Sequence, residues 1–237
     1  MSDRVQQYKL TVSNLSKSFK LHNRGGTRVH GFADIHLRLQ CGELLALSGP
    51  SGAGKSSILK TIFRTYLADR GSVLFRRGDG STVDLVSCKE SQVLDLRKRE
   101  IAFVTQFLKI LPRISALDTV AHPLIEIGET EENAREQARN MLDRLGIRRE
   151  LFELSPLTFS GGEQQRVNIA RGIIAPKELI LLDEPTASLD QKSSNVVLEL
   201  LGDLKRRGIA MVAIFHDQKK IDLIADHAVT VTREEEQ

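Results

Sequence analysis

The chain has 237 residues, of which 41% are hydrophobic and 27% are charged. This composition excludes a wholly disordered chain, a collagen-like fibre and a membrane-embedded protein, and the length suffices for a core without disulfide staples. The 34 Lys and Arg residues exceed the 31 Asp and Glu residues by only three, so the totals predict no nucleic-acid partner.

Cysteine content and apolar runs indicate the compartment. Only Cys41 and Cys88 are present, too few for a disulfide scaffold, and the start of the chain lacks the apolar stretch of a secretory signal. The longest fully apolar run, 209–215, is far shorter than the about 20 residues of a membrane-spanning helix. We therefore expect a cytoplasmic protein that reaches a membrane only through a partner.

Apolar alternation and turn signals predict a β-rich first part of the chain. Strands are expected at 8–12, 35–39, 44–47, 72–77 and 82–86. Asp79 and Gly80 lie between the last two strands and favour a tight hairpin turn. Apolar residues at helical spacing predict a helix over 56–67.

Helices and apolar strands alternate in the rest of the chain. Thr130 is a candidate N-cap of a helix that stops at Gly146, and another helix is expected from Ser160 to before Pro176. The apolar runs 179–182 and 209–215 flank a helix that ends at Gly208. Two such runs separated by a helix are typical of a parallel sheet covered on both faces, so the sequence predicts an α/β fold.

A glycine-rich phosphate-binding motif follows the strand predicted at 44–47. The pattern G-x-x-x-x-G-K-[ST] is matched by Gly49, Pro50, Ser51, Gly52, Ala53, Gly54, Lys55 and Ser56. Its glycines let backbone N–H groups converge on a polyphosphate at the start of a helix, while Lys55 reaches the outer phosphates and the Ser56 hydroxyl binds Mg²⁺. The motif predicts a nucleotide site, against the alternative of a plain glycine-rich turn.

Two carboxylates follow the apolar run 179–182. Asp183, at the end of a buried strand, can hold Mg²⁺ through water, and Glu184 can orient or deprotonate a water molecule. The alternative is an acidic turn or helix start, where carboxylates are common.

Further motifs resemble those of ATP-binding cassette (ABC) ATPases. The family signature LSGGQ-x-QR is similar to the run Phe159, Ser160, Gly161, Gly162, Glu163, Gln164, Gln165 and Arg166. Alone, Ser160 and Glu163 could be a capping box on a helix. The order of the other motifs favours the resemblance, because 187–190 resembles the D-loop, Gln106 the Q-loop glutamine and His216 the switch histidine.

The resemblance covers about 10–231 and implies a P-loop NTPase fold of the ABC type. It implies a mostly parallel core sheet flanked by helices, an N-terminal antiparallel β-subdomain and a helical subdomain that carries the signature. It further implies a single ATP-binding domain over 1–237, with the helical subdomain inserted at about 107–175.

The resemblance also implies site residues for ATP and Mg²⁺. Phe19 would stack on adenine, and Gly49 to Ser57 would wrap the phosphates. The metal shell would consist of Ser56, Gln106 and Asp183. Glu184 would be the general base, His216 would sense the γ-phosphate, and Gln106 would complete the catalytic set.

In the family, the signature of one chain closes over the P-loop nucleotide of another. The resemblance therefore implies a head-to-tail homodimer on ATP binding, with two shared sites to which Ser160, Gly161 and Gly162 contribute. Phe159 and Glu163 depart from the signature but leave those three residues in place.

Three segments, 106–117, 158–172 and 214–217, resemble the PhnL-type cassettes of the bacterial carbon–phosphorus lyase system. This implies an accessory ATPase motor of phosphonate catabolism, with soluble lyase subunits and another ABC protein as partners. The alternative is the ATP-binding subunit of a lipoprotein-release type transporter, peripheral at the inner membrane on a separate permease. A nucleotide-binding scaffold without turnover is a third hypothesis. The basic runs 97–99 and 148–149 are interpreted as solvated faces, with docking patches as the alternative.

Overall fold

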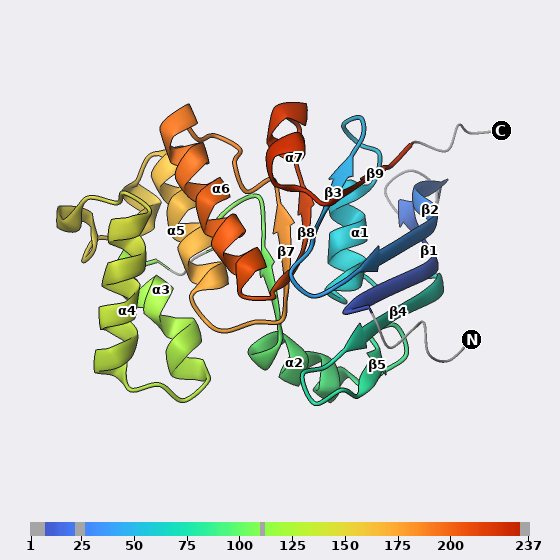
Figure 1. Ribbon diagram of the computed structural model, residues 1–237, viewed down its shortest axis with the longest axis horizontal. Coiled ribbons are helices and arrows are strands. Elements are labelled where there is room, and N and C mark those ends of the chain that lie inside the picture. Colours follow the sequence, from blue (N-terminus) through green and yellow to red (C-terminus); the bar gives the residue numbers. More distant parts are fainter. Residues whose placement is uncertain (1–7, 22–26, 110–111, 233–237) are drawn as a thin grey trace.

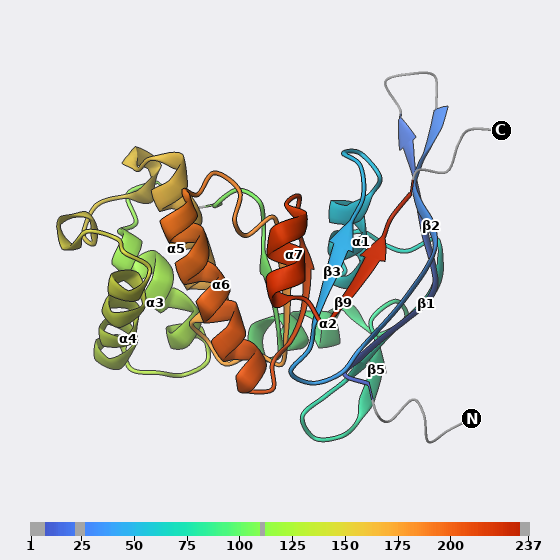
Figure 2. The ribbon, with the colours of Figure 1, turned by 45° about the horizontal axis from the view of Figure 1, so that its top comes forward.

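The computed structural model describes residues 8–21, 27–109 and 112–232, so residues 110 and 111 of the segment 106–117 lie outside the described residues. Two sheets organise the chain (Figures 1 and 2). An antiparallel sheet has the strand order β2-β1-β4-β5, and a parallel sheet has the order β6-β7-β8-β3-β9. The predicted α/β fold, with its antiparallel first part and parallel core, is confirmed.

The antiparallel sheet consists of β1 (Leu10–Leu21), β2 (Thr27–Leu39), β4 (Arg70–Arg76) and β5 (Thr82–Asp84). The parallel sheet consists of β3 (Leu44–Ser48), β6 (Ile101–Val104), β7 (Leu179–Asp183), β8 (Ala210–Ile214) and β9 (His227–Thr230). The α-helices are α1 (Lys55–Ile62), α2 (Glu90–Arg99), α3 (Ala116–Glu126), α4 (Glu131–Arg144), α5 (Gly161–Ile173), α6 (Gln191–Arg206) and α7 (Gln218–Ile224). Two 3₁₀ turns, η3 (Arg149–Leu151) and η4 (Pro156–Thr158), precede α5.

Successive residues of the parallel strands belong to two different cores. Leu45 and Leu47 of β3 pack in a core shared with α1 and the antiparallel sheet, and Figure 2 shows α1 between the two sheets. Leu44 and Ala46 belong to the core shared with α3, α5 and α6. Because both faces of the sheet are covered, its strands are apolar throughout instead of alternating with polar residues.

Helices α3, α4 and α5 form the end of the molecule farthest from the antiparallel sheet (Figure 1), and we call this part the helical arm. The Thr130 hydroxyl caps α4 by accepting from the N–H of Asn133 at 3.3 Å, and Gly146 follows the helix with a φ of 68°. Ser160 caps α5. The predicted limits of these two helices are confirmed.

Several predicted boundaries are wrong. The helix expected over 56–67 ends at Ile62, because Arg64 has a left-handed φ of 65° that a helix cannot contain. The first hairpin is much longer than predicted, since bulges near Asn14 and Asp34 interrupt the alternation that the prediction followed. Sequence reasoning also missed α2, β6, α3, α7 and β9, most of which are short or present few buried residues.

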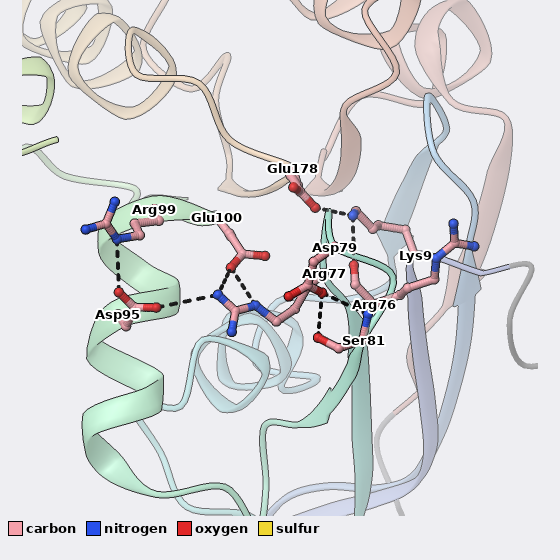
Figure 3. Close-up of polar contacts among 9 residues, drawn as sticks. All are labelled: Lys9, Arg76, Arg77, Asp79, Ser81, Asp95, Arg99, Glu100 and Glu178. Carbon is pink, nitrogen blue, oxygen red and sulfur yellow. Dashed lines mark hydrogen bonds and ion pairs between the residues drawn. The ribbon is translucent and has the colours of Figure 1, made fainter.

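Ion pairs tie the antiparallel sheet and α2 to the parallel sheet (Figure 3). Lys9, only 6% exposed, pairs with Glu178 just before β7 and donates to the carbonyl of Arg76 at 2.7 Å. The Arg77 guanidinium donates to Glu100, which just precedes β6, at 2.7 Å from Nε. Breaking such a pair by removing one partner is costly, because the other charge is left buried.

The basic run 97–99 is only partly a solvated face. Lys98 and Arg99 are exposed, as predicted. Arg97 is half-buried with its guanidinium carbon 4.5 Å from the centre of the Phe63 ring, and it donates to the Phe63 carbonyl at 2.7 Å. The prediction is wrong for this residue, because its aromatic neighbour comes from a segment 34 positions away.

Candidate active site

The predicted phosphate and acid residues meet at one edge of the parallel sheet. Strand β8 pairs in parallel with β3 on one side and β7 on the other, so the carboxyl ends of the three strands lie at the same edge. The glycine-rich loop follows β3, Asp183 ends β7, and His216 comes two residues after the end of β8. This edge is the usual place for ligands in open α/β sheets.

The glycine-rich loop depends on backbone conformations that only glycine adopts without strain. Gly49 and Gly54 have φ angles of 128° and 91°. A Cβ on Gly54 would lie 2.0 Å from the carbonyl oxygen of Gly31 in β2. The loop is thereby packed against the antiparallel sheet before it enters α1, which begins at Lys55.

Lys55 and Ser56 are held by two different sets of partners. The Lys55 ammonium is 6% exposed and donates to the carbonyls of Gly49 at 2.7 Å and Pro50 at 2.8 Å. The Ser56 hydroxyl donates to Asp183 Oδ1 at 2.9 Å. Burial raises the pKa of the Asp183 carboxyl, although the Ser56 hydrogen bond opposes this shift.

Glu184 forms a second polar group beside the first. Its Oε1 lies 2.6 Å from His216 Nε2, and its Oε2 accepts from the Gln106 amide at 3.1 Å. Glu184 has a left-handed φ of 56°, a costly conformation for a residue that is not glycine. The structure therefore brings Gln106 to Glu184 and not into contact with Asp183.

Gln165 is a site residue for which sequence reasoning predicted no role. Its buried amide donates to the carbonyls of Glu184 at 3.3 Å and Pro185 at 3.4 Å, and so ties α5 to the strained turn. The available signal was its place among the signature residues, but its partners are the backbone carbonyls of the two residues that directly follow β7, which a sequence pattern does not reveal.

Phe19 lies beside the glycine-rich loop through Gly31. A Cβ added to Gly31 would lie 2.6 Å from a ring carbon of Phe19, and the Gly31 carbonyl packs closely against Gly54 of the loop. The ring also contacts Tyr66 edge-on, with centroids 5.1 Å apart, and lies 5.6 Å from the Lys17 ammonium. No role was predicted for Tyr66.

Among the described residues, no hydrogen bond joins Ser160 to the phosphate loop. Ser160 and Gly161 are exposed, and a Cβ on Gly162 would lie 3.1 Å from the carbonyl oxygen of Ser188. The Ser160 hydroxyl bonds only to Glu163 within the described part of the chain. Asp190 of the predicted D-loop instead caps α6, accepting from the N–H of Ser193 at 2.7 Å.

The donor atoms at the sheet edge suit a hard divalent cation. Ser56 and Asp183 supply a hydroxyl and a carboxylate, oxygen ligands that Mg²⁺ prefers together with water and phosphate oxygens. Across residues 8–21, 27–109 and 112–232, no group of three or more His, Cys, Asp and Glu side chains could hold a metal by itself.

Comparison with known proteins places these features in a family context. The sequence model of a family described as ABC transporter matches residues 32–187. The ATP-binding protein YvrO of Bacillus subtilis, an uncharacterized ABC transporter protein, is 36% identical over 88% of this chain and 87% of its own length. The lipoprotein-releasing system ATP-binding protein LolD of Bordetella pertussis is 38% identical over 84% of both chains. The macrolide export ATP-binding/permease protein MacB of Pasteurella multocida is 36% identical over 90% of this chain but only 31% of its own length.

Two solved structures share the fold over nearly the whole chain. The dimeric structure of MJ0796, a bacterial ABC transporter cassette, is 27% identical with a TM-score of 0.85 and covers 94% of each chain. A dimeric post-hydrolysis state of the same cassette, bound to ADP and Pi, is 26% identical with the same TM-score and coverage. No described helix of this chain is long and apolar enough to cross a membrane.

Proposed function

The chain belongs to the ABC transporter family, and from this premise we infer that it is the motor subunit of a transporter, working as a head-to-tail dimer on a separate permease. It is an ATP hydrolase of the ABC type. One observation carries the proposal: a phosphate loop, a hydroxyl–carboxylate pair and a carboxylate–imidazole pair converge at one sheet edge. We also propose that 1–237 is a single domain with the helical subdomain inserted at about 107–175.

We assign ATP binding to the loop 49–57, with Phe19 stacking on adenine. Lys55 forms no ion pair with a carboxylate in the described part of the chain, so its charge is available to a polyphosphate. Its two carbonyl partners, Gly49 and Pro50, belong to the loop itself, so the loop already holds the ammonium beside its own backbone. The proximity of Phe19 to the loop through Gly31 supports its assignment.

We assign the Mg²⁺ that accompanies ATP to Ser56 and Asp183. Ser56 and Asp183 would hold the ion, which would supply positive charge to neutralise phosphate oxygens. Asp183 is 3% exposed and its burial disfavours the ionised form, so a cation at this place would relieve that cost. Gln106 is also predicted as a metal ligand. Its amide donates to Glu184 at 3.1 Å, so we propose that it serves both the metal and the water that Glu184 holds.

We assign proton transfer to Glu184. A water held by its carboxylate would attack the γ-phosphate in line, with no covalent intermediate on the protein. His216 and Gln106 hold the two carboxylate oxygens, so both can fix the orientation of Glu184 and exchange partners when a γ-phosphate arrives. This matches the predicted switch role of His216.

The second half of each site is proposed to come from another copy of the chain. Ser160 to Gly162 lie at the start of α5, where the positive end of the helix favours an anion, and the Ser160 hydroxyl bonds only to Glu163 among the residues described. The dimeric cassettes described above, which share the fold, support a homodimer. ATP bound to one chain would then hold the other, and hydrolysis would release it.

A basic groove beside Gln106 is our candidate docking site for the permease. The cavity has a volume of about 280 Å³ and lies between α2 and β6 on one side and α3 and α5 on the other. Phe63, Phe103 and Pro123 give it apolar walls, and its cations are Arg97, Lys98, Lys109, Arg171 and Lys177. Glu126 is its one acidic lining residue among the residues described.

The charge of this groove indicates the chemistry of its occupant. None of the five cations forms an ion pair with a carboxylate within the described ranges. Burial lowers the pKa of Lys177 and of Arg97, against the weaker attraction of Glu126 and Glu90 respectively, so burial costs both cations part of their hydration. A partner segment with acidic and apolar side chains would offset both.

Phosphonate catabolism is a second candidate setting for the same ATPase. The resemblance of 106–117, 158–172 and 214–217 to cassettes of the carbon–phosphorus lyase system favours it, and Lys109 of the first segment lines the groove. The relatives reported above are transporter proteins and do not support it. In this setting, a soluble lyase subunit would occupy the groove.

Affinity capture of the tagged full chain from fractionated cells distinguishes these settings. A permease recovered from the membrane fraction supports the transporter proposal, whereas lyase subunits recovered from the membrane-free fraction, with no permease, support the second setting. Arg171→Glu should lower partner recovery about tenfold or more, because it reverses one charge in the groove. Arg139→Glu, an exposed position on α4 away from the groove, is the matched control. Absence of ATP hydrolysis by the wild-type complex would contradict both settings.

A further inference from the structure

At the start of α5, the carboxylate of Glu163 is hydrogen-bonded to Ser160, the residue proposed to contact the γ-phosphate. The Ser160 hydroxyl donates to Glu163 Oε2 at 2.7 Å, and the Ser160 N–H donates to the same oxygen at 3.0 Å. A serine hydroxyl has a single proton to donate. While this bond persists, Ser160 has no proton to offer a phosphate oxygen of another chain.

Glu163 remains charged under ordinary conditions. The Ser160 hydroxyl and N–H lower its pKa, and Arg148 and Arg166 add to this effect. The ionised carboxylate lies at the positive end of α5, where it takes the place that an external anion would otherwise have. It also repels a phosphate that approaches the same donors.

The guanidinium of Arg148 lies close to the Glu163 carboxylate. Arg148 Nη2 is 3.8 Å from Glu163 Oε1, the oxygen that Ser160 does not use. Arg148 is 64% exposed and also pairs with Glu150 at 2.8 Å, so its guanidinium has room to move. A small rotation of the Glu163 side chain would exchange the Ser160 hydroxyl for Arg148.

We propose that Glu163 is a positioning residue that holds the Ser160 hydroxyl in the single chain, and that its release toward Arg148 accompanies ATP-dependent closure of the dimer. The inference rests on the shared-site dimer proposed above. It gives a role to a residue at which this chain departs from the family signature, and to one basic residue of the run 148–149. Glu163 thereby sets how much ATP the dimer requires.

The test compares variants in a Glu184→Gln parent, which should bind ATP without turning it over. Light scattering measures the ATP concentration that gives half-maximal dimer. Glu163→Gln should lower this concentration about fivefold, because charge-assisted hydrogen bonds are about twice as strong as neutral ones. Glu136→Gln on the exposed face of α4 removes the same charge from the helical arm without touching Ser160 or Arg148, and should shift this concentration less than about twofold.

Arg148→Ala adds a measurement that a helix-capping role would not affect. It should raise the ATP requirement about threefold in the parent and leave it unchanged when Glu163 is already Gln, as in a double-mutant cycle. A merely structural Glu163 predicts that Glu163→Gln lowers the melting temperature and leaves dimerisation unchanged or weaker. Either of those dimer results would overturn the inference, whereas a parent that never dimerises with ATP would contradict the proposed function itself.

Discussion

The two halves of the proposed ATP site differ in how the single chain satisfies their polar groups. At the sheet edge, Lys55 and Asp183 are 6% and 3% exposed, and Ser56 and Asp183 bond across two elements that are 127 positions apart. At the start of α5, Ser160 is exposed and bonds only within its own turn among the residues described. The fold of one chain brings the residues of the first half together. The second half is an exposed surface whose Ser160 hydroxyl bonds only to Glu163 among the residues described.

The largest expected effect is the loss of ATP binding when Lys55 of the first half is replaced. Lys55→Ala should weaken ATP binding by more than about 100-fold, because two or more charge-assisted hydrogen bonds to phosphate are lost. Titration with a fluorescent ATP analogue measures this. Arg139→Ala, which removes a cation from the exposed face of α4, should bind ATP as the wild type does, and tight binding by Lys55→Ala would refute the assignment of the loop.

Ser160→Arg should separate the two halves. The single chain should bind ATP within about twofold of the wild type, while hydrolysis falls about 100-fold or more, because the bulky cation blocks closure of the second chain. Equilibrium binding and steady-state phosphate release measure the two quantities. Asn140→Arg on the exposed face of α4 is the control, and lost ATP binding by single Ser160→Arg chains would remove the distinction between the halves.

The sequence predicts the first half of the site better than its surroundings. Lys55, Ser56 and Asp183 lie in motifs that directly follow or end two apolar strands of the same parallel sheet, and the structure brings Ser56 and Asp183 together. The partners of Arg97 and Gln165 escaped prediction, because both bond to backbone carbonyls of distant segments. Backbone acceptors carry no residue identity, so a sequence pattern does not reveal them.

Removing a helix cap in the helical arm should lower the stability of the protein without changing ATP binding at the phosphate loop. Thr130→Ala removes the side-chain cap of α4 and should cost about 1 kcal/mol of unfolding free energy. Chemical denaturation followed by circular dichroism measures the cost. Thr130→Ser keeps the cap and serves as the control, and a change in ATP affinity of Thr130→Ala would show that the two regions are coupled.

The smallest expected effect concerns the strand that carries Phe19. Hydrogen bonds from Lys17 and Ser18 lower the pKa of Asp69 to about 2. Because the folded-state pKa lies below the unfolded value, the stabilisation is present above about pH 4 and is lost as the pH falls toward 2. Asp69 is 40% exposed, so the contribution should stay below about 1 kcal/mol. Asp69→Asn should flatten the pH dependence of unfolding between these values, and an unchanged dependence would contradict this account of Asp69.

If one chain holds only half of each ATP site, the mass of the Glu184→Gln variant must depend on ATP. Light scattering should show a monomer without nucleotide and a dimer with two bound ATP molecules when ATP is added. The same measurement on the Glu184→Gln, Ser160→Arg double variant should give a monomer that still binds ATP. A Glu184→Gln chain that binds ATP and remains a monomer, or a dimer that survives Ser160→Arg, would contradict the account.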